Sequence, residues 1–66
     1  MNQEHFEFVK NNLLLFTTSR RYAPHELAMI FEIYNAITGE SKKTTACGRC
    51  VETTKKRVLH EYTKMI

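Results

Sequence analysis

The segment from Thr45 to the C-terminus carries the pattern that most restricts the fold of this chain. Apolar or small side chains recur there at steps of three and four residues, which is the spacing of one face of an α-helix. They are Cys47, Cys50, Val51, Thr54, Val58, Tyr62 and Ile66. The opposite face is polar and basic, with Arg49, Thr53, Lys56, Arg57, His60 and Lys64. A helix of this kind must pack its apolar face on other elements, so the pattern predicts a helical domain.

Two further segments show helical periodicity. Residues 2–17 place apolar side chains at helical spacing after Asn2, a residue type that caps helix N-termini. Residues 24–38 start at Pro24 and stop before Gly39, which suit the first turn and the C-cap of a helix. With a last helix over residues 45–64, the sequence predicts an all-α, three-helix bundle in a single domain, residues 1–66. The expected core is Phe6, Val9, Leu13, Phe16, Leu27, Ile30, Phe31, Tyr34, Ile37, Val51, Val58 and Tyr62.

The length and composition restrict the class of protein. A chain of 66 residues supports one domain, which buries only about 60% of its unfolded surface, so a partner, a metal or a second copy would add needed stability. No apolar run approaches the roughly 18 residues of a membrane span, and the N-terminus lacks the basic-then-apolar order of a signal peptide. These features predict an intracellular protein without membrane contact.

The helices carry more apolar side chains than a three-helix core can cover. Phe8 and Leu15 flank the stripe of the first helix, and Met29 and Ile33 form a second apolar line on the helix over 24–38. Exposed apolar surface of this kind marks interaction sites. The first hypothesis is therefore a small non-enzymatic protein-interaction module that uses these four residues to form a homo-oligomer or to dock on a larger protein.

Positive charge is concentrated in the C-terminal part, where residues 42–66 have a net charge of +5 against −2 for residues 1–41. Lysine and arginine side chains at helical spacing can contact successive phosphates. The alternative function is therefore nucleic-acid binding through Lys42, Lys43, Arg49, Lys55, Lys56, Arg57 and Lys64. A solvated helix face explains the same pattern, and Glu52 and Glu61 interrupt it.

Cys47 and Cys50 allow three interpretations. A redox C-x-x-C pair normally follows a strand, and this sequence has no strand pattern. A structural zinc ion needs four ligands, so the pair would be completed by His25 or His5 in the same chain, or by the cysteines of a second chain. The third interpretation, which we favour from sequence, is that both are reduced apolar residues that pack the start of the last helix against its neighbour. On that interpretation no cofactor is needed.

The remaining residue types give no catalytic signature. His5, His25 and His60 are each expected at the surface, and no nucleophile with an adjacent base or glycine-rich phosphate loop is present. The sequence therefore predicts no catalytic residues and no enzyme activity.

A resemblance to a known group of proteins rests on residues 34–62. Tyr34-Asn35, Thr38-Gly39, a loop with lysines, the run T-x-C-G-x-C over residues 45–50 and a basic helix together resemble short uncharacterised helical proteins of tailed bacteriophages. The resemblance implies a phage accessory or virion-associated protein, located in the bacterial host cytoplasm or in the virion. It carries no known catalytic residue to this sequence.

Overall fold

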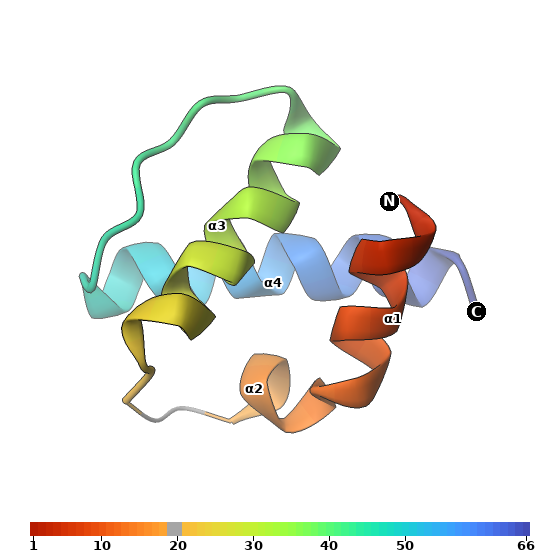
Figure 1. Cartoon of the computed structure of the whole chain (residues 1–66), viewed down its shortest axis with the longest axis horizontal. Coiled ribbons are helices and arrows are strands. Elements are labelled where there is room, and N and C mark those ends of the chain that lie inside the picture. The colour runs from red at the N-terminus through yellow and green to blue at the C-terminus, as the bar shows by residue number, and fades with distance from the viewer. Residues whose placement is uncertain (19–20) are drawn as a thin grey trace.

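The computed structural model describes residues 1–18 and 21–66, which form four α-helices (Figure 1). They are α1 (Gln3–Asn11), α2 (Leu13–Thr17), α3 (Pro24–Thr38) and α4 (Gly48–Lys64). The all-α class is confirmed, but the predicted count of three helices is wrong, because the first helix is two. In the described part of the chain, no helix combines the length and the apolar character needed to cross a membrane. Ser19 and Arg20, which lie between the first two predicted helices, are outside the described residues.

The predicted first helix, residues 2–17, is interrupted at Asn12. Its N-cap is as expected, since the side-chain oxygen of Asn2 accepts the backbone N–H of His5 at 2.7 Å. At Asn12 the backbone leaves the helical region, with φ −130° and ψ 38°, and the side-chain amide donates to the Phe8 carbonyl at 2.8 Å. Asparagine favours such local bonds, which compete with the helical ladder.

The break changes which side chains of α2 face inward. Leu15 and Phe16 are buried, whereas Leu13 is 40% and Leu14 is 73% exposed. A continuous helix would keep Leu13 on the stripe of Val9, which is why the prediction of a buried Leu13 is wrong.

Helix α3 begins and ends where the sequence predicts. The backbone N–H of Ala23, which precedes Pro24, donates to the carboxylate of Glu26 at 2.8 Å. Gly39 ends the helix in the left-handed region at φ 76°, and its N–H donates to the Asn35 carbonyl at 2.8 Å. Glycine adopts this conformation without the strain that a Cβ atom would bring.

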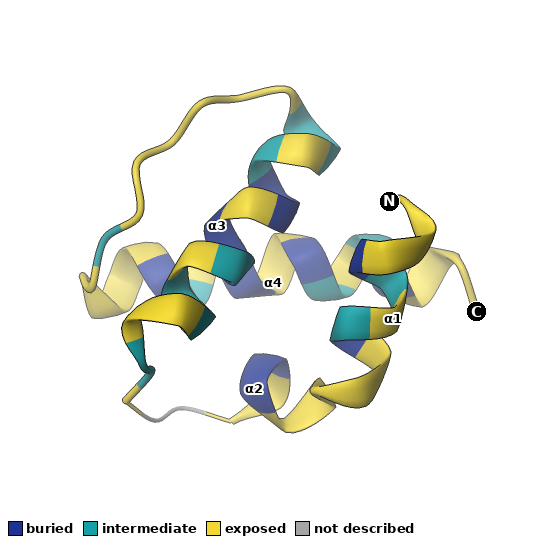
Figure 2. Cartoon of the chain, in the orientation of Figure 1, coloured by how far each residue is buried: buried dark blue, intermediate teal, exposed yellow. Residues whose placement is uncertain are grey.

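The core lies where α3 crosses α4, with α1 and α2 closing it from the other end (Figures 1 and 2). Its buried apolar members are Val9, Leu15, Phe16, Ile30, Phe31, Ile33, Tyr34, Val51, Val58 and Tyr62. Phe6, Leu27 and Ile37 of the predicted core are partly buried and pack against this cluster. Helix α4 starts at Gly48 rather than near Thr45, and its buried face begins at Val51.

The interface predicted from surplus apolar residues lies largely inside the fold. Ile33 is fully buried and Leu15 is 3% exposed, so neither offers a surface to a partner. Phe8 and Met29 are partly buried and pack against the core. The interruption at Asn12 explains the difference for Leu15, because it turns α2 so that this side chain faces the core. The large apolar residues that remain exposed are Leu13, Leu14, Met65 and Ile66.

Candidate functional site

Helix α4 presents a solvent-exposed side that we call the outer face. Its members are Arg49, Thr53, Lys56, Arg57, His60, Thr63 and Lys64. All of α4 is described, and none of its exposed residues is acidic; Glu52 and Glu61 are both partly buried at the edges. The outer face therefore carries cations, hydroxyls and one imidazole along the length of the helix.

Internal contacts occupy part of the outer face. Glu61 Oε1 forms ion pairs with Arg57 Nε at 3.4 Å and with Lys64 Nζ at 3.6 Å, as expected for oppositely charged side chains one turn apart. In the described part of the chain, neither Arg49 nor Lys56 takes part in an ion pair. Arg49 and Lys56 are therefore the cations of the outer face whose charge is least compensated by carboxylates.

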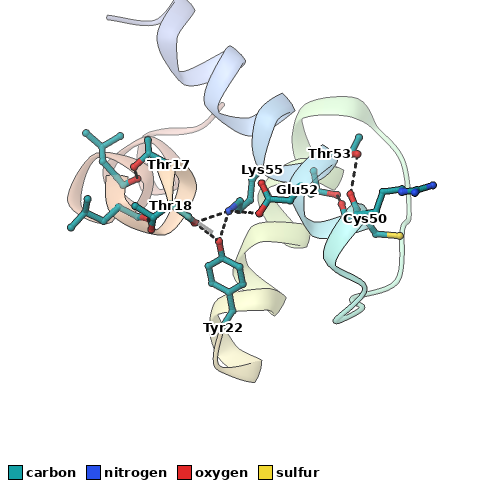
Figure 3. Close-up of polar contacts among 11 residues, drawn as sticks. Thr17, Thr18, Tyr22, Cys50, Glu52, Thr53 and Lys55 are labelled. Carbon is teal, nitrogen blue, oxygen red and sulfur yellow. Dashed lines mark hydrogen bonds and ion pairs between the residues drawn. The ribbon is translucent and has the colours of Figure 1, made fainter. Parts of the chain in front are cut away.

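Lys55 was predicted to belong to the basic surface, and this prediction is wrong. Its side chain is buried, with 1% of the residue exposed. The ammonium Nζ donates to the Thr18 carbonyl at 3.0 Å and to the Tyr22 hydroxyl, and it pairs with Glu52 Oε1 at 3.1 Å (Figure 3). An ammonium has three N–H donors, and these three acceptors match them. Lys55 therefore stabilises the fold and is not available to a ligand.

The loop lysines lie at the exposed surface as predicted. Asn35 fixes the backbone at Lys42 through two hydrogen bonds of 3.0 Å, one donated by its amide and one accepted by its side-chain oxygen. The Lys42 ammonium lies 4.9 Å from the centroid of the Tyr34 ring, a cation–π contact. Lys43 is exposed.

Cys47 and Cys50 are both free and exposed, so the prediction that they pack the start of the last helix against its neighbour is wrong. Cys47 is the N-cap of α4, with extended backbone at φ −61° and ψ 118°. Cys50 lies in the first turn, and its side chain points away from the buried ammonium of Lys55 (Figure 3). Because α4 begins at Gly48, the first position of the helix that meets the core is Val51.

Cys47 and Cys50 shift each other's pKa. The backbone N–H and the thiol of Cys50, together with the backbone N–H of Arg49, lower the pKa of Cys47. The interaction with the Cys47 sulfur raises the pKa of Cys50, and the positive charges of Lys42 and Arg49 oppose that shift. Cys47 is therefore the thiol that ionises first.

The histidines named as zinc ligands within one chain do not join the cysteine pair. Over residues 1–18 and 21–66, no three His, Cys, Asp or Glu side chains converge as a metal site. His5 is buried, contrary to prediction, because it lies one turn before Val9 on the inner side of α1; its Nε2 lies 3.2 Å from Glu32 Oε2. His25 and His60 are exposed as predicted.

A pocket of about 520 Å³ opens beside the start of α4, which sequence reasoning did not identify. It is lined by Arg21, Tyr22, Leu27, Ala46, Gly48, Val51 and Glu52. Two of these residues, Ala46 and Gly48, flank Cys47 in the chain. The pocket lies between the starts of α3 and α4, and no local pattern in the sequence indicates that these two segments are neighbours.

No family model, curated protein or solved structure matches this chain.

Proposed function

We propose that the protein is a small non-enzymatic binding module whose outer face of α4 docks on the phosphate backbone of a nucleic acid. One observation carries this proposal: the exposed side of α4 holds four cations and no carboxylate, over a helix that is described throughout. Phosphate oxygens accept hydrogen bonds and attract cations, so a surface of donors whose flanking carboxylates are partly buried suits them.

The dimensions of the outer face fit this role. From Arg49 to Lys64 the helix rises about 22 Å at about 1.5 Å per residue, a length that spans several phosphates of one strand. Lysine and arginine are long enough to reach phosphates while the helix axis stays outside the contact. Contacts of this kind set position and affinity without reading bases, so we expect binding with little sequence preference.

The loop before α4 extends the same surface. Lys42 and Lys43 precede Arg49 in the chain, and the charge of Lys42 acts on Cys50 in the first turn of α4. Because Asn35 holds the backbone at Lys42, this lysine projects from a fixed point. The proposed contact surface therefore comprises the loop lysines and the outer face, without Lys55.

The proposal is tested by measuring the affinity for a short DNA duplex by fluorescence anisotropy as salt is raised. Neutralising about four phosphates predicts a loss of about 100-fold in affinity between 50 and 200 mM salt. Lys56→Gln with Arg57→Gln removes two cations of the outer face and should lower the slope of the logarithm of affinity against the logarithm of salt concentration by about two units.

Lys10→Gln with Arg21→Gln is the matched control, since it changes the net charge equally at exposed positions outside α4. It should leave the salt slope unchanged. Equal losses in the two variants, or an affinity that does not respond to salt, would contradict the proposal.

Protein interaction is the second candidate function, favoured by the exposure of Leu13 and Leu14 on α2. A second copy in a homo-oligomer, or a larger protein partner, would cover this exposed apolar surface. Such a role agrees with the phage accessory setting that the resemblance of residues 34–62 implies. Sedimentation in the presence of EDTA tests this self-association in the absence of bound metal. Leu14→Ser should weaken the self-association. A monomer of 7.8 kDa across the micromolar range would exclude a homo-oligomer.

A further inference from the structure

The position of Cys47 and Cys50 is not explained by packing. Cysteine is among the residue types most often buried, yet both thiols face water and α4 first meets the core at Val51. Two soft sulfur ligands are thus held next to each other at the surface of a small protein. Because packing does not explain their position, we look to the chemistry of the two thiols.

The pair has the sequence spacing of half a tetrahedral zinc site. Cys47 is the N-cap of α4 and Cys50 lies three residues later in the first turn, so both exposed thiols belong to the same end of the helix. Two cysteines separated by two residues have the ligand spacing that structural zinc sites use, with zinc–sulfur bonds of about 2.3 Å. The pair can therefore supply two of the four ligands of one metal ion.

The charged side chains beside the pair are cationic. Arg49 lies between the two cysteines in the chain, and the charges of Arg49 and Lys42 both act on Cys50. A zinc ion with four thiolates carries a net charge of −2, which cations beside the sulfurs stabilise.

One chain cannot complete this site. Structural zinc is four-coordinate, and in the described part of the chain no third His, Cys, Asp or Glu side chain converges with the cysteines. We propose that Cys47 and Cys50 of two copies of this chain together bind one zinc ion, which bridges them as a symmetric dimer. The two-fold axis passes through the metal, and because the thiols are already exposed no part of the fold has to open.

The binding step exchanges protons and involves no oxidation. Four thiols lose four protons, and one Zn²⁺ gains four Zn–S bonds. Zinc-dependent dimerisation should therefore strengthen as pH rises through the pKa values of the thiols, and it requires them to be reduced. The zinc proposal does not rest on the nucleic-acid proposal, and its assembly is measured without nucleic acid.

Native mass spectrometry of the reduced protein titrated with ZnSO₄ tests the proposal. We expect a dimer of two 7.8 kDa chains with one zinc ion, which EDTA returns to monomers. Titration with Co²⁺ in place of zinc should give the absorption bands of a tetrahedral thiolate complex at one metal per two chains.

Cys47→Ser with Cys50→Ser should abolish the zinc-bridged dimer while circular dichroism shows unchanged helix content. The matched control Ala28→Ser alters another exposed site, on α3, and should keep the zinc dependence. Three results would each overturn the proposal: one zinc ion on a monomer, a dimer that forms equally well in EDTA, or no zinc retained by the fully reduced protein at tens of micromolar.

Discussion

In both the first turn and the middle of α4, the burial of a side chain differs from what is usual for its residue type. At the start, Cys47 and Cys50 are exposed, although cysteine is usually buried. In the middle, Lys55 is buried, although lysine is almost never buried without a partner. The comparison shows that a side chain's place on the helix and the partners within its reach decide burial here, and that hydrophobicity alone does not.

The position of Lys55 on the helix explains its burial. It follows Val51 by four residues and precedes Val58 by three, so it lies on the buried stripe of α4. Its stem crosses the interior, and its ammonium meets the Thr18 carbonyl at the end of α2. Carbonyls at a helix C-terminus lack partners within their own helix and attract cations. Lys55 thus joins α4 to the end of α2, 37 residues earlier in the sequence.

The largest effect in this comparison is expected for Lys55→Ala. The change removes a buried stem and takes one donor away from each of three acceptors, which should lower the free energy of unfolding by about 3 kcal/mol. Urea unfolding followed by circular dichroism measures it. Lys56→Ala, at the next and exposed position, should change stability by less than about 0.5 kcal/mol. Similar values for the two variants would refute the structural role of Lys55.

A smaller loss is expected for Tyr22→Phe. The Tyr22 hydroxyl accepts from Lys55 and donates to the Thr18 carbonyl at 2.8 Å, so removing it takes one acceptor from a buried cation. The expected loss is about 1 to 1.5 kcal/mol, measured by the same urea unfolding. Tyr62→Phe is the control, since no hydrogen bond of the Tyr62 hydroxyl occurs in the described part of the chain, and it should cost less.

Local signals were enough to predict α3 and the polarity of α4. Pro24 and Gly39 act through their own backbone, so both ends of α3 follow from the sequence, and helical phase places Arg49, Lys56 and Arg57 on the exposed side. The interruption at Asn12 did not follow, because asparagine within a helical pattern is common. Nor did the acceptors of Lys55, because the Thr18 carbonyl approaches it only after the chain has folded. The exposure of the cysteines depends on a shift of the helix start, from near Thr45 to Gly48.

Replacing the cysteines should have a smaller effect still. In the presence of EDTA, Cys47→Ser with Cys50→Ser should leave the urea midpoint unchanged, because neither thiol contributes to the core. A loss as large as that of Tyr22→Phe would mean that the thiols pack in solution, and it would remove the contrast between the two parts of α4.

The last prediction leaves the fold unchanged and concerns the order in which the two thiols ionise. Donors from Cys50 and Arg49 stabilise the Cys47 thiolate and lower its pKa, whereas donating to Cys47 raises the pKa of Cys50. Since the thiolate is the form that reacts, iodoacetamide should modify Cys47 at a lower pH than Cys50 in the reduced, metal-free protein. Peptide mass spectrometry over a series of pH values measures both rates. Cys50→Ala removes the thiol donor but keeps the backbone N–H, so the pH midpoint for Cys47 should rise only part of the way towards that of an ordinary cysteine. Arg49→Gln keeps the backbone donor at residue 49 and should preserve the order of reaction. If Cys50 reacted first, the N-cap position of Cys47 would not control the chemistry of the pair.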